Sequence, residues 1–242
     1  MRGILQNRQV AWLGLVAAGA ASLYGQSDAK QTVTEFMGHK VILVEPKRDA
    51  NGFPEESYRV CFDATTPRRR CYEPPTEFAP FGLSPELKVI DLGRGRTALF
   101  FAVSANFGGP GTIVSLALLH PGQRDEIDNR LVLEGHLSEI STHLFWNESS
   151  VSDAPILVTA NYVWGDSEAR FDDHRFIVSA YVLKTSLMAP EDFSYRLEDR
   201  YMTIRKYASD DRTGVLAAEK PEILARLKRV KAEEERRKKT PR

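Results

Sequence analysis

The residues best suited to chemistry lie in one polar segment, residues 165–174, between two apolar stretches. Its ionisable members are Asp166, Glu168, Asp172, Asp173 and His174. Carboxylates and an imidazole are the groups that general acid–base catalysis uses, and clustered carboxylates can also hold Ca²⁺. The EF-hand spacing is absent, however, and adjacent residues such as Asp172 and Asp173 point to opposite sides of a strand. The alternative interpretation is a solvated hairpin loop.

A second set of polar residues has spacings of three and four. His136, Glu139 and His143 would share one face of a helix, as helical zinc ligands do. The order H-x-x-E-x-x-x-H matches no zinc motif, and Gly135 and Thr142 weaken a helix here. We therefore expect neither a metal site nor a cofactor.

Motifs for nucleophilic catalysis and phosphate binding are missing from the sequence. No G-x-S-x-G segment occurs, and Ser104 and Ser115 lie in apolar stretches typical of strands. The glycine-rich segment 107–111 contains Pro110, which removes a backbone donor that a phosphate loop needs. The sequence thus predicts no catalytic residues.

Aromatic side chains offer a binding surface instead. The tryptophans beyond the first 25 residues are Trp146 and Trp164. A platform for sugars or peptides would combine them with Phe145, Tyr162, Phe171 and Tyr181, although aromatic residues in strands commonly belong to the core. The candidate ligand-binding residues are Tyr162, Trp164, Asp172, Asp173 and His174.

The elements that must position these residues are mostly strands. The segments 87–92 and 96–104 flank Gly-Arg-Gly, which indicates a tight hairpin, and 155–164 and 175–183 flank the polar segment. Further strands are expected at 40–45, 58–62, 112–119, 130–134 and 201–205. Short strands with Gly and Pro turns between them predict a mainly β fold, an antiparallel sandwich or a barrel-like domain.

The two cysteines, Cys61 and Cys71, suggest a disulfide. A strand around Cys61, a turn at Thr66-Pro67 and a returning strand around Cys71 would bring the sulfurs together. The arginines 68–70 would then be exposed at the tip of this loop.

The chain ends in a helical pattern over 217–239. Ile223, Leu224, Leu227 and Val230 form one apolar stripe, which predicts docking on the β-rich body. The fully charged segment 233–239 follows. It is interpreted as a solvated terminus or, alternatively, as a basic handle for a partner or an anionic surface.

The first 25 residues resemble a signal peptide, with Arg2 and Arg8 before an apolar run. That run is shorter than the ~20 residues of a membrane span, although an uncleaved anchor is the alternative. We expect a signal peptide at 1–25, a β-rich domain at 26–217 and a helix with a charged tail at 218–242. The mature chain should have no transmembrane span and should be periplasmic or secreted.

Charge is distributed unevenly along a chain with 33 basic and 33 acidic residues. Residues 218–242 hold ten basic and five acidic side chains, whereas residues 26–217 hold 21 basic and 28 acidic ones. An acidic body argues against nucleic acid as a partner. The sequence favours an exported, non-enzymatic binding or envelope-associated protein. The alternatives are an extracytoplasmic hydrolase that uses the 166–174 segment, and an interaction protein that docks through its basic C-terminal helix.

Overall fold

The structure is a computed structural model of the 242-residue chain. It describes residues 32–63, 69–75, 80–106, 112–122, 126–133, 142–169, 172–186, 189, 191–208 and 212–239. These residues form thirteen strands and one helix. The predicted signal peptide at 1–25 lies outside the described residues.

The first sheet contains four antiparallel strands in sequence order. They are β1 (Thr32–Phe36), β2 (His39–Val44), β3 (Arg59–Phe62) and β4 (Arg70–Tyr72). Phe36 pairs with His39, so Met37 and Gly38 form a two-residue turn. Both have positive φ (52° and 78°), as the type I′ turn of a tight hairpin requires.

The second sheet also follows the sequence order. Its strands are β5 (Leu83–Gly93), β6 (Arg96–Asn106), β7 (Thr112–Pro121) and β8 (Ile127–Asn129). The hairpin predicted around Gly-Arg-Gly is therefore confirmed.

The third sheet has the order β12-β11-β10-β9, and a short strand β13 also pairs with β11. The bounds are β9 (Thr142–Trp146), β10 (Ile156–Val163), β11 (Asp173–Thr185), β12 (Phe193–Met202) and β13 (Tyr207–Ala208). The hairpin predicted on either side of the polar segment is the pair β10–β11.

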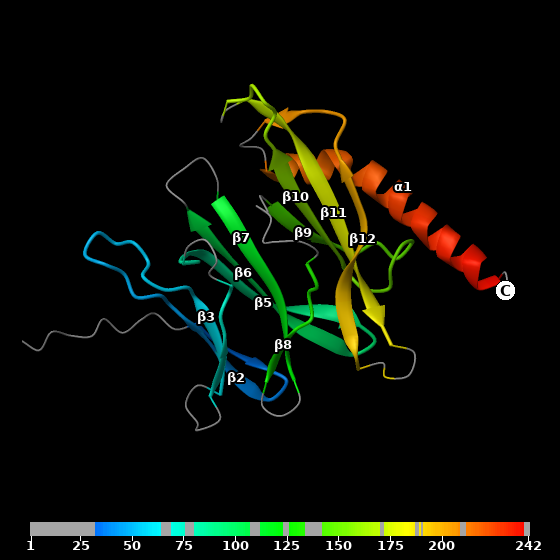
Figure 1. The fold of residues 1–242 in the computed structure, drawn as a ribbon. Helices are drawn as coiled ribbons and strands as arrows, with labels where there is room; N and C mark the ends of the chain where they lie inside the picture. The colour runs from blue at the N-terminus through cyan, green and yellow to red at the C-terminus, as the bar shows by residue number, and fades with distance from the viewer. Residues whose placement is uncertain are drawn as a thin grey trace, which may run out of the picture.

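The three sheets stack as layers, with the second sheet in the middle (Figure 1). On β6, Leu99 and Phe101 pack against the first sheet, while Phe100 and Ala102 pack against the third. Successive side chains of a strand point to opposite faces, so both faces of β6 are buried. This burial explains its nearly continuous apolar sequence. Within the described residues no sheet closes on itself, so the sandwich expectation is correct and the barrel-like one is not.

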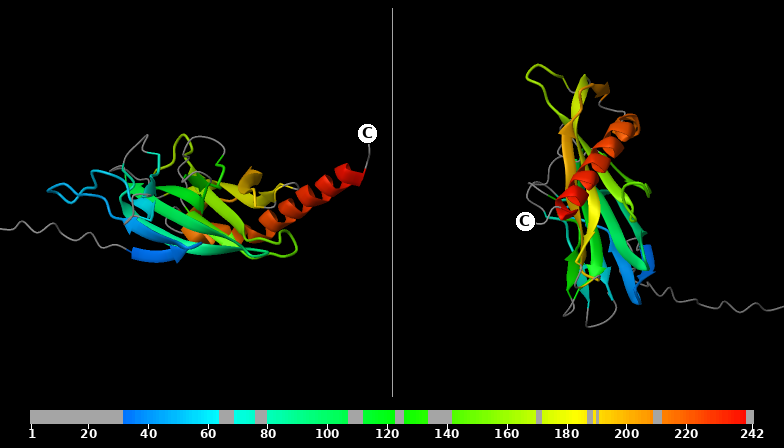
Figure 2. Two further views of the ribbon diagram at one scale, coloured as in Figure 1. Left: turned by 90° about the horizontal axis from the view of Figure 1, so that it is seen from below. Right: turned by 90° about the vertical axis from the view of Figure 1, so that its right-hand side faces the viewer.

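The helix α1 (Arg212–Lys239) covers the outer face of the third sheet. Val215, Leu216, Ile223 and Leu227 are buried against that sheet, and the C-terminal end of α1 extends past it (Figure 2). The docking predicted for the apolar stripe is thus confirmed. The helix starts at Arg212, earlier than expected.

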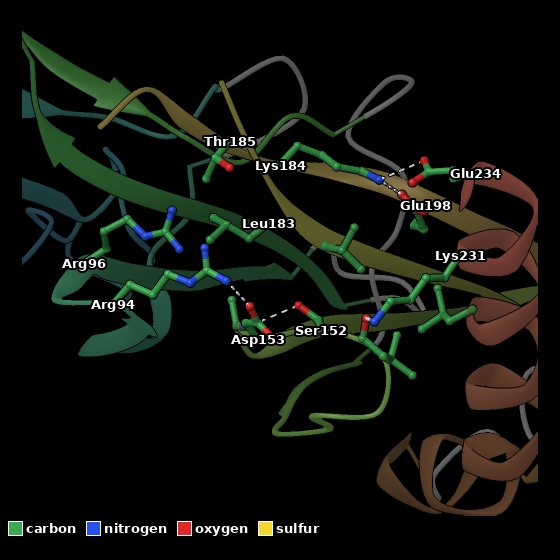
Figure 3. A pocket seen from close by; sticks show the side chains of 14 residues that line it. Arg94, Arg96, Ser152, Asp153, Leu183, Lys184, Thr185, Glu198, Lys231 and Glu234 are labelled. Carbon is green, nitrogen blue, oxygen red and sulfur yellow. Dashed lines mark hydrogen bonds and ion pairs between the residues drawn. The ribbon is translucent and has the colours of Figure 1, made fainter. Parts of the chain in front are cut away.

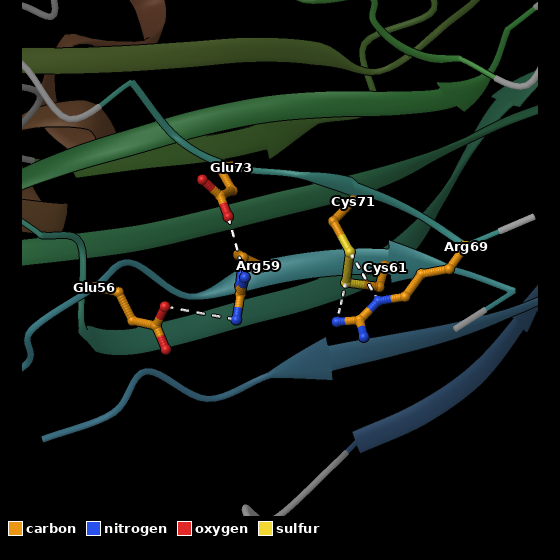
Figure 4. Close-up of a disulfide and its surroundings, with 6 residues drawn as sticks. All are labelled: Glu56, Arg59, Cys61, Arg69, Cys71 and Glu73. Atoms are coloured by element: carbon orange, nitrogen blue, oxygen red, sulfur yellow. Dashed lines mark hydrogen bonds and ion pairs between the residues drawn. A yellow bond between two sulfur atoms is a disulfide. The ribbon is translucent and has the colours of Figure 1, made fainter. Parts of the chain in front are cut away.

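Cys61 and Cys71 are disulfide-bonded and lie opposite each other on β3 and β4 (Figure 4). The predicted bridge is therefore confirmed. The Arg69 guanidinium lies against both sulfurs, with its nitrogens 3.4 Å and 3.7 Å from them. Arg70 differs from the expectation of an exposed loop tip: it is half-buried, lies over the Phe62 ring and donates to the Glu126 carbonyl.

Two sequence predictions differ from the observed strands. In the described part of 130–134 only Leu131 forms a bridge, to Tyr195, and the neighbouring strand is β8. The strand expected at 201–205 is instead the end of β12, followed by β13. No helix among the described residues has the length and apolar character needed to cross a membrane.

Candidate functional site

The β10–β11 hairpin brings three of the five sequence-predicted site residues together. The His174 ring is fully buried, and its centroid lies 5.4 Å from that of Tyr162 and 5.0 Å from that of Trp164. Trp164 remains 40% exposed. The aromatic rings thus cover the imidazole, while part of the Trp164 side chain lies at the surface.

Glu168 holds this hairpin end in place. Its carboxylate contacts His174 Nδ1 at 2.8 Å, accepts from the Gly165 amide at 2.8 Å and pairs with Lys206 Nζ at 2.6 Å. These interactions, that with Lys206 first, lower the pKa of Glu168 to about 2. A carboxylate bound on three sides stabilises the loop and is not a free acid or base.

Asp172 and Asp173 do not converge on His174. Both are exposed; Asp172 accepts from the Ala169 amide at 2.6 Å, and Asp173 pairs with Ala208 at the start of β11. The acid–base constellation of a hydrolase is therefore not assembled from these residues.

The wider aromatic platform is divided between faces of the third sheet. Trp146 packs in the core beneath α1, whereas Phe145 and Tyr181 face the second sheet. Phe171 lies outside the described residues. No shared surface is formed by Trp146 and Phe145.

His143 lies on β9 and its Nε2 is 3.0 Å from a Glu86 carboxylate oxygen. Burial lowers the pKa of His143, although the hydrogen bond to Glu86 acts in the opposite direction. His136 and Glu139 lie outside the described residues, and the described part of the chain contains no cluster of three metal-binding side chains. Beside His143 is a cavity of about 320 Å³, into which Ser104 also faces. The Ser104 hydroxyl donates to the Leu83 carbonyl at 2.9 Å, so its proton is engaged.

A charged cleft of about 300 Å³ lies where the second sheet, the third sheet and α1 meet. Its basic side chains are Arg94, Arg96, Lys184 and Lys231, and its acidic ones are Asp153, Glu198 and Glu234. Arg94 and Arg96 lie next to each other on one side, opposite α1 (Figure 3). Residues far apart in the sequence thus form one polar site.

The turn between β5 and β6 places Arg94, and Arg96 at the start of β6, beside the cleft. Gly93 pairs with Arg96, so Arg94 and Gly95 form a two-residue turn in which both φ angles are positive, 56° and 72°. A side chain at such a position is conformationally costly. Gly93 is needed for space, because a Cβ there would lie 3.1 Å from the Asp153 carbonyl oxygen. The turn can therefore approach the loop that carries Asp153, which pairs with Arg94.

A β-bulge supplies the acidic wall. Ala180 pairs with Asp199 and Tyr181 with Leu197, which leaves Glu198 as the extra residue of β12. Asp199 binds Arg226 of α1 through two hydrogen bonds, of 2.5 Å and 3.1 Å. Because of the bulge, the neighbouring carboxylates of Glu198 and Asp199 both lie at the junction between the third sheet and α1.

Lys184 connects the strands to α1. Its Nζ is 2.6 Å from Glu198 and 3.3 Å from Glu234. Burial would lower the pKa of Lys184, but the hydrogen bond and charge of Glu198, aided by Glu234, outweigh burial and raise it. On the same side, Lys231 donates to the Val151 carbonyl at 3.1 Å.

Arg96, like Lys231, makes a single hydrogen bond to a backbone carbonyl among the described residues. It is half-buried, and its Nε donates to the Gly93 carbonyl at 3.4 Å. Among the described residues no carboxylate pairs with it. Within this part of the chain, no group accepts a hydrogen bond from its terminal nitrogens.

No pattern in the sequence indicated this cleft. Arg94 and Arg96 belong to a predicted hairpin, and Lys231 to a predicted helix, but no spacing rule relates these segments. Comparisons of the chain with protein-family models, with curated proteins and with solved structures found no match.

Proposed function

We propose that this protein is a non-enzymatic binding module that works outside the cytoplasm and captures a small charged ligand. The observation that carries the proposal is the cleft of about 300 Å³ between the β5–β6 turn, the third sheet and α1. Its volume lies at the lower end of the range typical of small-molecule sites. Polar groups that converge from separate elements are what a specific ligand site requires.

The attachment of α1 to the third sheet supports this proposal. One wall of the cleft is α1, which is fixed by the double hydrogen bond between Arg226 and Asp199 and by buried side chains such as Leu227. A preorganised site loses less conformational entropy when it binds.

Two features support work outside the cytoplasm. The Cys61–Cys71 disulfide is of a kind that persists in oxidising compartments. Residues 1–25 have the pattern of a signal peptide. We expect the protein in the periplasmic or secreted fraction, with an N-terminus near residue 26. Cell fractionation and N-terminal sequencing check this, and a cytoplasmic full-length chain would contradict it.

The absence of catalysis is an expectation that an activity assay can test. His174 is fully buried, and Asp172 and Asp173 are exposed apart from it, so the geometry gives the hydrolase alternative little support. Turnover of generic ester, glycoside or peptide substrates that His174→Ala abolishes would favour the hydrolase instead.

The interaction alternative relies on the end of α1. Residues 233–239 are helical and exposed, with four basic residues in the last turn. Cations at a helix C-terminus interact favourably with the helix dipole, so the basic run also has a structural reason. Truncation after residue 232 that releases a bound partner would favour this alternative.

A ligand screen tests the main proposal. The purified disulfide-bonded protein is heated with anionic, cationic and neutral metabolites, and a binder raises its Tm. Thr185 lies exposed at the cleft, so Thr185→Trp fills the site without changing its charge. We expect at least one binder whose effect is lost in this variant. Binders that act equally on both proteins, or none at all, would contradict the proposed site.

A further inference from the structure

The balance of charges in the cleft indicates which ligands it takes. Asp153 pairs with Arg94, and both Glu198 and Glu234 pair with Lys184. The acidic side chains are thus engaged by two of the cations. Arg96 and Lys231 also line the cleft, and neither forms an ion pair with a carboxylate among the described residues.

We infer that the cleft binds a small oxyanion, a carboxylate or phosphate group, through Arg96 and Arg94. This inference rests on the proposed binding function and specifies its ligand class. The planar guanidinium group offers parallel N–H donors that match the two oxygens of a carboxylate or phosphate. Arg96 provides terminal N–H donors that no other described residue engages, and Lys231 adds positive charge from the α1 side.

Asp153 is an internal competitor for the ligand. Its carboxylate pairs with the Arg94 guanidinium, and the two side chains are largely exposed, Arg94 to 72% and Asp153 to 69%. An exposed ion pair contributes little stability, so a ligand oxyanion can replace this carboxylate at low cost. The pair also shows that the cleft accommodates a carboxylate beside Arg94.

The test measures binding of inorganic phosphate and of citrate to the full protein by isothermal titration calorimetry. We expect both probes to bind, and the tighter one identifies phosphate or carboxylate as the preferred group. Arg96→Gln should weaken binding by about tenfold or more, the effect of losing a charge-assisted hydrogen bond. The matched control is Arg175→Gln, because Arg175 is exposed at the opposite end of β11 and its loss removes the same charge.

Two further variants separate ligand binding from structural effects. Asp153→Asn should tighten binding, because it releases Arg94. Arg94→Gly should weaken binding while the Tm stays equal or rises, since glycine suits the positive φ. A merely structural role for Arg94 would lower the Tm and leave affinity unchanged.

The outcomes distinguish this inference from the function on which it rests. If Arg96→Gln and Arg175→Gln weaken anion binding equally, or if only cations or neutral compounds bind in a manner that Thr185→Trp abolishes, the oxyanion inference is wrong and the binding function stands. If Thr185→Trp weakens the binding of no compound, the proposed binding function itself is wrong.

Discussion

At the scale of single residues, Glu168 shows how one carboxylate organises the end of a hairpin. Its carboxylate pairs with Lys206 and forms hydrogen bonds with the Gly165 amide and the buried His174. These contacts keep its pKa near 2, well below the ordinary value of 4.5. The folded protein therefore holds this carboxylate ionised at a pH where the unfolded chain protonates it.

This shift predicts the pH dependence of stability. Glu168 stabilises the fold above about pH 4.5, and its contribution is lost as the pH falls from 4.5 towards 2. Glu168→Gln should lower the Tm at neutral pH and flatten the decline of Tm in this acidic window. Thermal unfolding followed by circular dichroism at several pH values measures this.

Glu191→Gln is the matched control for that experiment, since Glu191 is exposed and no pairing partner contacts it among the described residues. The control should keep the wild-type pH profile. Identical profiles for the two variants would contradict the role of Glu168.

At the scale of elements, α1 is held by a stripe of apolar side chains as well as by ion pairs. Leu227 is 1% exposed, whereas Leu224 on the next edge of the stripe is half-buried. Arg226, between Asp199 and the Tyr201 ring, closes the junction from the polar side. The helix is thereby a structural part of the third sheet.

Truncation of the two leucines should separate these contributions. Leu227→Ala should lower the free energy of unfolding by about 2–4 kcal/mol, because it leaves a cavity in the core under α1. Leu224→Ala should cost less, since part of its side chain stays in water. Urea unfolding of both variants provides the comparison, and equal losses would show that the stripe is not docked as described.

The Cys61–Cys71 disulfide links β3 and β4 covalently in the first sheet, away from α1. It closes a loop with a sequence separation of 10. The double variant Cys61→Ala/Cys71→Ala should lose roughly 2–3 kcal/mol, chiefly because the unfolded chain gains freedom. A reducing agent should destabilise the wild type by a similar amount and leave the double variant unchanged; an effect of the reductant on the double variant would refute this explanation.

Some elements could be predicted from the sequence and others could not. The β5–β6 hairpin was predictable because Gly93 and Gly95 mark a turn locally, and the stripe of Ile223 and Leu227 marks one face of a helix. Most of β12 was missed because four of its ten residues are charged and most of its side chains are partly or fully exposed. Its bulge at Glu198 also breaks the alternation that identifies strands. The signal for such a strand lies in its partners, which a single sequence does not reveal.

The candidate site was less predictable than the fold. Tyr162, Trp164 and His174 are close in sequence across one hairpin, so their contact followed from the strand pairing. Arg96 and Lys231 line the same cleft only because the sheets and α1 stack, which depends on long-range packing. Arg94 was predicted as part of a turn, and its place in the cleft beside Asp153 could not be predicted from the sequence.

At the scale of the whole molecule, the second sheet joins the layers because it belongs to two cores. Leu99 of β6 is fully buried against the first sheet, and Leu118 of β7 is fully buried on the face towards the third. Neither outer layer can unfold without exposing one face of this sheet. We therefore expect the described layers to unfold as one cooperative unit.

Leu99→Ala and Leu118→Ala test that cooperativity. Each should lower stability by about 2–5 kcal/mol and shift a single transition. Circular dichroism follows all the strands, whereas tryptophan fluorescence follows the third sheet through Trp146 and Trp164. If Leu99→Ala shifted only the circular dichroism curve, the layers would unfold separately.

The position of α1 as one wall of the cleft links ligand capture to the attachment of the helix. Lys231 and Glu234 belong to the helix and line the site, so a ligand held there opposes detachment of the helix. A ligand present at 100 times its Kd would raise the free energy of detachment by about 2.7 kcal/mol. Amide protons in α1 that exchange with solvent only when the helix detaches should then exchange about a hundredfold more slowly, so the helix itself would report whether the cleft is filled.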